Sequence, residues 1–169
     1  ENIMAAIRIA ASIYVPMEYI KKAIVSLYGV EHRIEYVDEK NGVKYYNDSK
    51  GTNPDAAIKG IKAMVTPTLL IGGGFDKDSK YEEWIQAFDD KVKCLVLLGQ
   101  TREKIAKTAN RLGFHNIIMV DTLEEAVNVC SKRAKPGDSV LLSPACASWG
   151  MFKNYEERGR VFKELVHKL

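Results

Sequence analysis

An α/β fold is predicted by this sequence: a Rossmann-like, mainly parallel sheet that begins with an antiparallel hairpin and is preceded by helices. Continuous apolar runs such as Leu95-Val96-Leu97-Leu98 are typical of strands that helices cover on both faces. These runs alternate with segments whose apolar residues recur every three or four positions, as in amphipathic helices. Alternating strands and helices favour a parallel sheet with right-handed crossover connections.

The first helices are predicted within residues 2–28. Apolar residues recur at helical spacing in both halves of this segment, and Pro16 separates the halves. We expect two helices that join near Tyr14–Met17, the second ending at Gly29. Because the chain opens at Glu1 with a helical segment, and with neither a methionine nor a signal peptide, we also expect it to be a piece of a longer protein.

A β-hairpin is predicted next, formed by Arg33–Asp38 and Val43–Asn47. Asn41-Gly42 lies between them and supplies the positive φ angles of a tight turn. Further strands and helices then follow in alternation. The expected strands are 68–71, 94–98, 116–120 and 139–142, and the expected helices are 54–64, 80–88, 102–112, 123–133 and 155–167.

Length and composition exclude several function classes. The chain has 169 residues, 46% hydrophobic and 28% charged, as expected of a globular domain. Its 25 basic and 22 acidic residues give a net charge of +3, too little to indicate nucleic-acid binding. No apolar run reaches the roughly 18 residues that cross a bilayer. Cys94, Cys130 and Cys146 lack disulfide or metal-ligand spacing, which favours a reducing, cytoplasmic compartment.

Ligands of parallel sheets bind beyond the carboxyl ends of the strands, so the segments that follow the strands are the candidate sites. The first of them places Asp48, Lys50 and Thr52 just ahead of a predicted helix, with Asn53 as its N-cap and Pro54 at its first position. An acceptor, a cation and a hydroxyl beside a helix N-terminus suit a phosphate or carboxylate ligand.

A second candidate segment follows the strand predicted at residues 68–71. Its three glycines, 72–74, match neither GxGxxG nor GxxxxGK[ST], and we interpret them as a sharp exit of the chain from the strand. Lys77 lies just beyond them, where an anionic ligand would bind. It is therefore the candidate cation of this segment.

A third candidate segment, residues 143–148, follows the last predicted strand. Its small residues allow the close approach of a ligand, and Ser148 offers a hydrogen-bond donor. We interpret Cys146 as a packed residue and not as a nucleophile, because no catalytic histidine signature accompanies it. Trp84 and Trp149 are expected to be packing residues.

Three segments resemble a known family: residues 47–54, 142–148 and 154–159. They are similar to the carboxyl-terminal domain of the Mur ligases of peptidoglycan synthesis. The Asp-Ser-Lys-x-Thr-Asn string that begins at Asp48 resembles the D-glutamate-adding branch, although Gly51 stands where many members have alanine, which we expect to be a mild departure. The resemblance implies that residues 31–169 form that domain and that residues 1–30 end the central ATPase domain.

The resemblance also implies an activity, amide formation driven by ATP and assisted by Mg²⁺. A carboxylate of UDP-N-acetylmuramoyl-L-alanine would be phosphorylated to an acyl phosphate, which the amine of D-glutamate would then attack. By resemblance, Arg33, Asp48 and Lys50 contact ATP, and Thr52, Lys77, Ser148 and Tyr155 contact D-glutamate. The sequence contains no GxxxxGK[ST] loop, so we expect no catalytic residue and no metal ligand in this chain, and no activity from it alone.

Two alternatives remain open. One is a sister ligase that uses another amino acid or a folate-type substrate, which the string beginning at Asp48 disfavours. The other is a nucleotide-binding or interaction module without chemistry, which the helical start at Glu1 disfavours. The sequence does not predict the oligomeric state.

Overall fold

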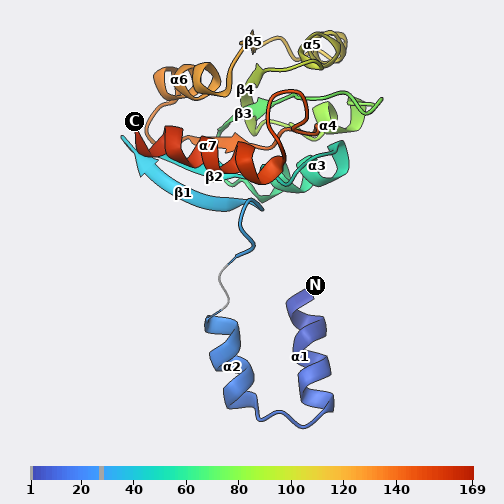
Figure 1. Ribbon diagram of the computed structural model, residues 1–169, viewed down its shortest axis with the longest axis vertical. Helices are drawn as coiled ribbons and strands as arrows, with labels where there is room; N and C mark the ends of the chain where they lie inside the picture. The colour runs from blue at the N-terminus through green and yellow to red at the C-terminus, as the bar shows by residue number, and fades with distance from the viewer. Residues whose placement is uncertain (1, 27–28) are drawn as a thin grey trace. The chain divides into compact units, whose positions relative to one another are not determined.

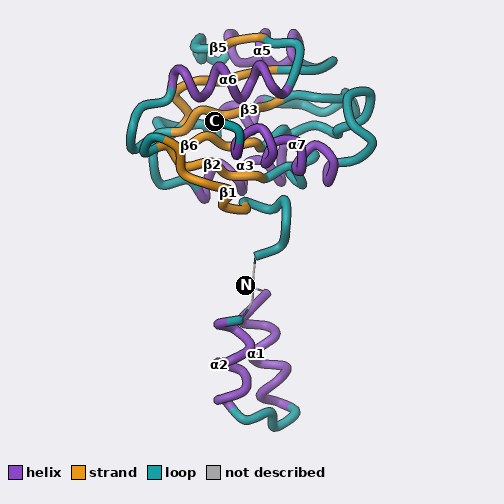
Figure 2. Tube along the Cα trace, turned by 60° about the vertical axis from the view of Figure 1, so that its left-hand side comes forward, coloured by secondary structure: helices purple, strands orange, loops and turns teal. Residues whose placement is uncertain are grey.

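A six-stranded sheet organises residues 31–169 in the computed structural model, which describes residues 2–26 and 29–169 (Figure 1). In spatial order its strands are β1 (Glu35–Lys40), β2 (Val43–Asn47), β6 (Ser139–Leu142), β3 (Thr68–Gly72), β4 (Val92–Leu97) and β5 (Ile117–Met119). Figure 2 shows the same order, from β1 at the bottom of the sheet to β5 at its top. Only the β1–β2 pair is antiparallel among these strands, which confirms the predicted fold class.

Helices pack on both faces of the sheet. They are α3 (Pro54–Ala63), α4 (Glu82–Gln86), α5 (Arg102–Arg111), α6 (Leu123–Arg133) and α7 (Tyr155–His167). The first three share one apolar core with Leu70 of β3, and the last two share a second core with Leu69 and Ile71 of the same strand. Because successive side chains of a strand point to opposite faces, the unbroken apolar run of β3 serves both cores.

The hairpin turn confirms the prediction from the Asn-Gly pair. Asn41 and Gly42 have φ angles of 53° and 75°, the backbone that a right-twisted two-residue turn requires. The start of β1 differs from the prediction, because the strand begins at Glu35 and not at Arg33. His32 and Ile34 have φ angles of 63° and 49°, so the chain turns sharply here before it enters the sheet.

Other predicted boundaries shift by a few residues. The helix expected over residues 80–88 is the shortest in this unit, α4, which ends at Gln86 before Asp89 takes a φ of 48°. The glycines that follow β3 do provide a sharp exit: Gly73 and Gly74 have φ angles of 97° and 152°. A Cβ atom at either position would lie closer than 3.0 Å to a backbone oxygen, so the interpretation of these glycines is confirmed.

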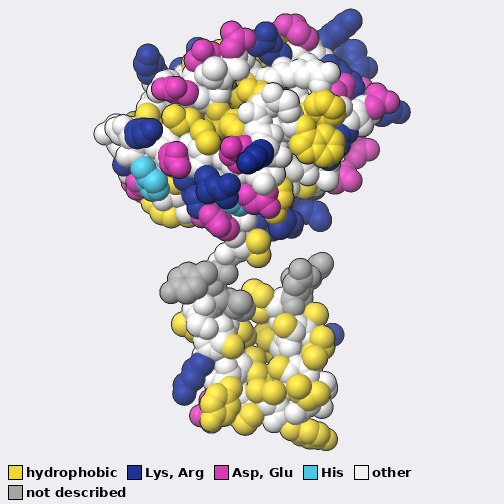
Figure 3. All heavy atoms as spheres, viewed as in Figure 1, with side chains coloured by type: hydrophobic (Ala, Val, Ile, Leu, Met, Phe, Trp, Pro, Cys, Tyr) yellow, Lys and Arg dark blue, Asp and Glu magenta, His cyan; other side chains and the backbone are white. Residues whose placement is uncertain are grey.

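Residues 1–30 form a separate compact unit. It contains α1 (Asn2–Ser12) and α2 (Met17–Val25), and the predicted continuation of the second helix to Tyr28 lies outside the described residues. Figure 3 shows many hydrophobic side chains on the surface of this helix pair. The origin of these residues in a central ATPase domain stays a prediction. In the described part of the chain, every helix is too short or too polar to cross a membrane.

Gly159 of α7 should be intolerant of alanine, even though alanine favours helices by about 1 kcal/mol. A Cβ atom at this position would lie closer than 3.0 Å to the ring of the buried His32. We expect Gly159→Ala to lower the free energy of unfolding by about 1–2 kcal/mol through overpacking. Denaturant unfolding followed by tryptophan fluorescence measures this, since both tryptophans lie in residues 31–169. Arg160→Ala, at the exposed neighbouring position, is the control and should change stability little.

Candidate functional site

Two loops lie side by side at the carboxyl ends of the central strands. One follows β2 and the other follows β6, and these parallel strands are neighbours, with Asn47 opposite Leu142. The Asp48 N–H donates to the Leu142 carbonyl oxygen at 2.7 Å, so the pairing continues into the loops. The Ser143 hydroxyl then donates to Asp48 Oδ2, also at 2.7 Å. Residues almost a hundred positions apart in sequence are thereby held in one site.

Arg158, which lies near the start of α7, connects the two loops through hydrogen bonds from its guanidinium group. Its Nε and Nη2 atoms donate to the side-chain and backbone oxygens of Ser49 at 2.9 and 2.8 Å. Its Nη1 atom donates to the backbone oxygen of Cys146 at 3.2 Å. The side chain is 3% exposed, and burial lowers the pKa of Arg158 to about 10, so the guanidinium stays charged at neutral pH.

Sequence reasoning assigned no role to Arg158, although a signal was present. Arg158, Phe162 and Val166 recur at four-residue spacing and all three are buried on the inner face of α7. A charged residue on an otherwise apolar helix face is buried only when its hydrogen bonds are satisfied. The position of Arg158 on that face therefore predicts buried acceptors nearby.

Asp48 is the buried acid of the site, with 4% of its surface exposed. It accepts hydrogen bonds from the Ser143 hydroxyl and from the Ile34 N–H, the latter at 3.3 Å. Burial raises the pKa of Asp48 to about 6, against a smaller opposing effect of the Ser143 hydrogen bond. The carboxyl group is thus held in place but is costly to ionise.

Two glycines make room for the Asp48 carboxyl group. A Cβ atom at Gly51 or at Gly60 would lie 2.7 Å from Asp48 Oδ2. We expected alanine in place of Gly51 to be a mild difference, but in this structure it would require the carboxyl group to move away from Ser143. The glycine is therefore matched to the position of Asp48.

The predicted nucleotide-binding residues lie together. Arg33, Asp48 and Lys50 line one cavity of about 430 Å³, and Lys59 of α3 adds a further cation to its wall. The three cations outnumber the two acids of the lining, Asp48 and Asp55, which favours a polyanionic ligand, and the two acids can accept hydrogen bonds from its hydroxyl groups. Asn53 Oδ1 accepts from the Ala56 N–H at 2.9 Å, which confirms the predicted N-cap of α3.

Lys50 also connects this cavity to the predicted amino-acid site. Its Nζ atom lies 5.4 Å from the centroid of the Tyr155 ring, within cation–π range. Tyr155 meets His32 edge to face, with ring centroids 6.1 Å apart. The backbone oxygen of Tyr155 also accepts from the Ser49 hydroxyl at 2.7 Å. A phenylalanine at this position would provide the same ring and the same backbone oxygen. Thr52 is half-buried in the same loop but does not line the cavity.

The other two predicted amino-acid-binding residues lie on the loops after β3 and β6. Ser148 is buried, whereas Lys77 is exposed and its Nζ atom lies 4.9 Å from the centroid of the Trp149 ring. Trp84 is fully buried, as expected of a packing residue, but Trp149 is 52% exposed. Trp149 packs against Phe75 but is not a core residue, so the prediction that it is a packing residue holds only in part.

All three cysteines are free and buried. Cys146 contacts the hydroxyl groups of Tyr81 and Thr101 at 3.2 and 3.3 Å, and burial raises the pKa of its thiol. A thiol that resists ionisation is a poor nucleophile, so the interpretation of Cys146 as a packed residue is confirmed.

Glu31, His32 and Glu35 form a cluster whose composition could suggest a metal. Lys163 occupies it, because its Nζ atom donates to both carboxylates, at 2.6 and 3.0 Å. Asn47 Nδ2 donates to His32 Nδ1 at 2.9 Å, and burial lowers the pKa of His32, so the imidazole is neutral. Mg²⁺ prefers an all-oxygen shell without a competing ammonium, and the cluster does not fit it.

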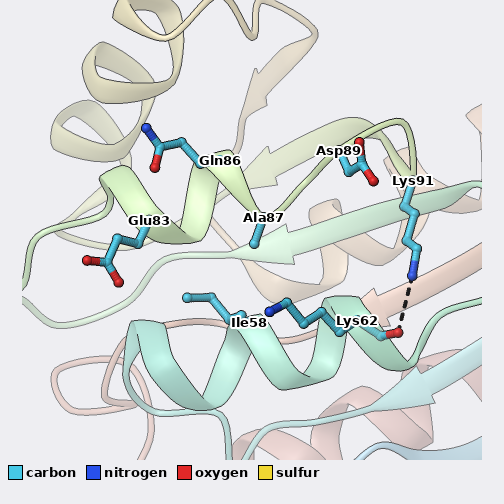
Figure 4. A pocket seen from close by; sticks show the side chains of 7 residues that line it. All are labelled: Ile58, Lys62, Glu83, Gln86, Ala87, Asp89 and Lys91. Atoms are coloured by element: carbon cyan, nitrogen blue, oxygen red, sulfur yellow. Dashed lines mark hydrogen bonds between the residues drawn. The ribbon is translucent and has the colours of Figure 1, made fainter.

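A larger surface cavity lies away from this site, between α3 and α4 (Figure 4). Its volume is about 460 Å³, and it is lined by Ile58, Lys62, Glu83, Gln86, Ala87, Asp89 and Lys91. Lys91 immediately precedes β4 and donates to the Lys62 carbonyl oxygen at 3.2 Å. None of the predicted site residues lines this cavity, and the amino end of a parallel strand is the wrong edge for a ligand.

Comparison with known proteins identifies one family and relatives that agree with it. The family described as "Mur ligase, glutamate ligase domain" matches residues 32–146. UDP-N-acetylmuramoylalanine--D-glutamate ligases from Lachnoclostridium phytofermentans and Lachnospira eligens are 68% and 58% identical over the whole chain. The chain covers 37% and 38% of these relatives, so it spans little more than a third of their length.

Solved structures share the fold. The UDP-N-acetylmuramate-alanine ligase of Thermotoga maritima has a TM-score of 0.73 at 15% identity, over 99% of this chain and 37% of that one. Escherichia coli FolC, solved in complex with ADP, has a TM-score of 0.66 at 18% identity, over 98% of this chain and 38% of that one. At these low sequence identities, the comparison shows that the folds are similar and nothing more.

The buried acid predicts a pH dependence of stability. Because the folded-state pKa of Asp48, about 6, lies above its ordinary value of 3.8, unfolding releases a proton between these pH values. The stabilising contribution of protonated Asp48 is therefore full below pH 4 and is lost as the pH rises through 6. Relative to Asp48→Asn, the wild type should lose about 2.5 kcal/mol of unfolding free energy between pH 4 and pH 7.

Denaturant unfolding at both pH values measures this difference. Asp90→Asn, at an exposed turn position, controls for the loss of one carboxylate. Equal pH dependence in the wild type and Asp48→Asn would contradict the raised pKa.

Proposed function

Because this chain belongs to the Mur ligase family, we propose that it forms the carboxyl-terminal domain of an ATP-dependent ligase that adds D-glutamate to UDP-N-acetylmuramoyl-L-alanine. One observation carries the proposal. The residues predicted to bind ATP line a single cavity, and Lys50 of that cavity contacts Tyr155 of the predicted D-glutamate set. The names of the most similar relatives support D-glutamate as the amino acid.

The cavity of Arg33, Asp48 and Lys50 suits the nucleotide. Arginine and lysine side chains pair with phosphate oxygens, and a fixed carboxyl group can hydrogen-bond a ribose hydroxyl. Asp48 cannot easily turn away from this position, because Ser143 and the Ile34 N–H hold it. We assign ribose recognition to Asp48 and phosphate recognition to the two cations.

Thr52, Lys77, Ser148 and Tyr155 are assigned to D-glutamate. A dicarboxylate needs a cationic partner and hydroxyl donors, which Lys77, Thr52 and Ser148 provide. Lys50 lines the nucleotide cavity and lies next to the ring of Tyr155, one member of this group. We place the acceptor carboxylate beside this lysine, whose ammonium would stabilise the negative charge that develops as a phosphoryl group moves from ATP to that carboxylate.

The reaction would proceed in two steps. The γ-phosphoryl group of ATP passes to the acceptor carboxylate, and the D-glutamate amine then attacks the acyl phosphate, so that an amide forms and phosphate leaves. Mg²⁺ would offset phosphate charge. We assign it no ligand in this chain, which contains no phosphate-binding GxxxxGK[ST] loop, and we expect both features in the rest of the parent protein.

We also place the reaction in the cytoplasm, which the free thiols of all three cysteines support. A sister ligase for another amino acid remains the second candidate, since distantly related ligases share the fold.

Phosphate release by the intact parent enzyme tests the proposal. The enzyme is given ATP, Mg²⁺ and UDP-N-acetylmuramoyl-L-alanine, with D-glutamate, L-glutamate, lysine or diaminopimelate supplied separately. We expect release that depends on D-glutamate, and none from residues 1–169 alone. Dependence on another amino acid would reassign the chain to a sister ligase, and no release with any of them would favour a module without chemistry.

A further inference from the structure

We propose that Trp149 is a positioning residue whose indole face holds the Lys77 ammonium in place for a carboxylate of the amino-acid substrate. This inference rests on the proposed function, because it takes Lys77 to be the cation that meets an acidic amino acid. It concerns a residue with no expected role beyond packing, which the structure leaves half-exposed directly after Ser148 in the chain.

The first support is the geometry of the contact. The 4.9 Å between Lys77 Nζ and the centre of the Trp149 ring lies well within the limit of about 6 Å for a cation–π interaction. Phe75 packs against the same indole, with ring centroids 5.4 Å apart and an interplanar angle of 61°. An aromatic edge thus fixes the orientation of the ring that holds the ammonium.

The second support is the way the two loops are joined. Lys77 follows β3 and Trp149 follows β6, and the Phe75 N–H donates to the Ala147 carbonyl oxygen at 2.9 Å. Gly74, with a φ of 152°, makes this approach possible, because a Cβ atom would overlap the same oxygen. Lys77 and Trp149 therefore project from a shared backbone bridge next to Ser148.

The third support is the charge balance around Lys77. The adjacent carboxylate, Asp76, is paired with Lys104 at 3.0 Å. No ion pair within the described part of the chain involves Lys77. An indole attracts an ammonium without neutralising it, whereas a carboxylate partner would compete with an anionic ligand. Trp149 therefore orders the lysine and leaves its charge available.

The test uses the intact parent enzyme, with phosphate release measured against D-glutamate concentration at saturating ATP. Trp149→Leu should raise the KM for D-glutamate roughly threefold to fivefold, the size expected of one exposed cation–π contact, with kcat and the KM for ATP unchanged. Trp149→Phe should recover most of the loss, because it restores an aromatic face. A general defect in folding would not raise the KM for D-glutamate while leaving kcat and the KM for ATP unchanged.

A double variant isolates the contact itself. Once Lys77→Met has removed the ammonium, Trp149→Leu should add no further increase in the KM for D-glutamate. Lys80→Met removes another exposed lysine further along the chain and should leave this KM unchanged.

The outcomes separate the two proposals. If the wild-type enzyme responds to D-glutamate but Trp149→Leu keeps the wild-type KM, or if the effects of the two substitutions add, the inference is overturned and the proposed function stands. If the wild-type enzyme does not respond to D-glutamate, the proposed function fails and this inference fails with it.

Discussion

The guanidinium of Arg158 is the interaction on which the arrangement of the site depends. It donates three hydrogen bonds, two to Ser49 and one to the Cys146 carbonyl oxygen, and so ties the loop after β2 to the loop after β6. Burying a charge is costly unless its donors are satisfied, and each charge-assisted hydrogen bond contributes about 1.5–3 kcal/mol. These hydrogen bonds therefore stabilise one arrangement of the two loops. Asp48 and Ser148, which lie on the loops, are held in fixed positions as a result.

The strand order explains why these loops meet at all. Because β6 lies between β2 and β3, the loops that carry Lys50, Ser148 and Lys77 leave the sheet from three adjacent strands. The antiparallel hairpin adds Arg33, which precedes β1 at the same edge as the end of β2. One edge of one sheet thus carries the proposed nucleotide cavity and, on the loop after β3, the Lys77 cation, and the contact of Lys50 with Tyr155 links the cavity to the start of α7.

Much of the fold could be predicted from local sequence. Apolar runs and helical periodicity identified the strands and helices, and Asn41-Gly42 identified the turn, because these patterns act over a few residues. The strand order could not be predicted in this way, since it depends on contacts between distant segments. The role of Arg158 could not be predicted from local sequence either, because its acceptors lie on loops that are distant in the sequence. The exposure of Trp149 could not be predicted because the apolar character of a residue does not show whether it lies in the core or at the surface beneath a lysine side chain.

One buried cation, Arg158, holds both loops of the site, and Arg158→Lys in the intact parent enzyme tests this role most directly. Lysine keeps the positive charge but cannot make the three-point contact of a guanidinium. The KM for ATP and the KM for D-glutamate are measured below the melting transition of the variant. We expect both constants to rise by about tenfold, because both loops lose their common support. A folded variant with wild-type constants, or with only one of the two changed, would contradict the claim.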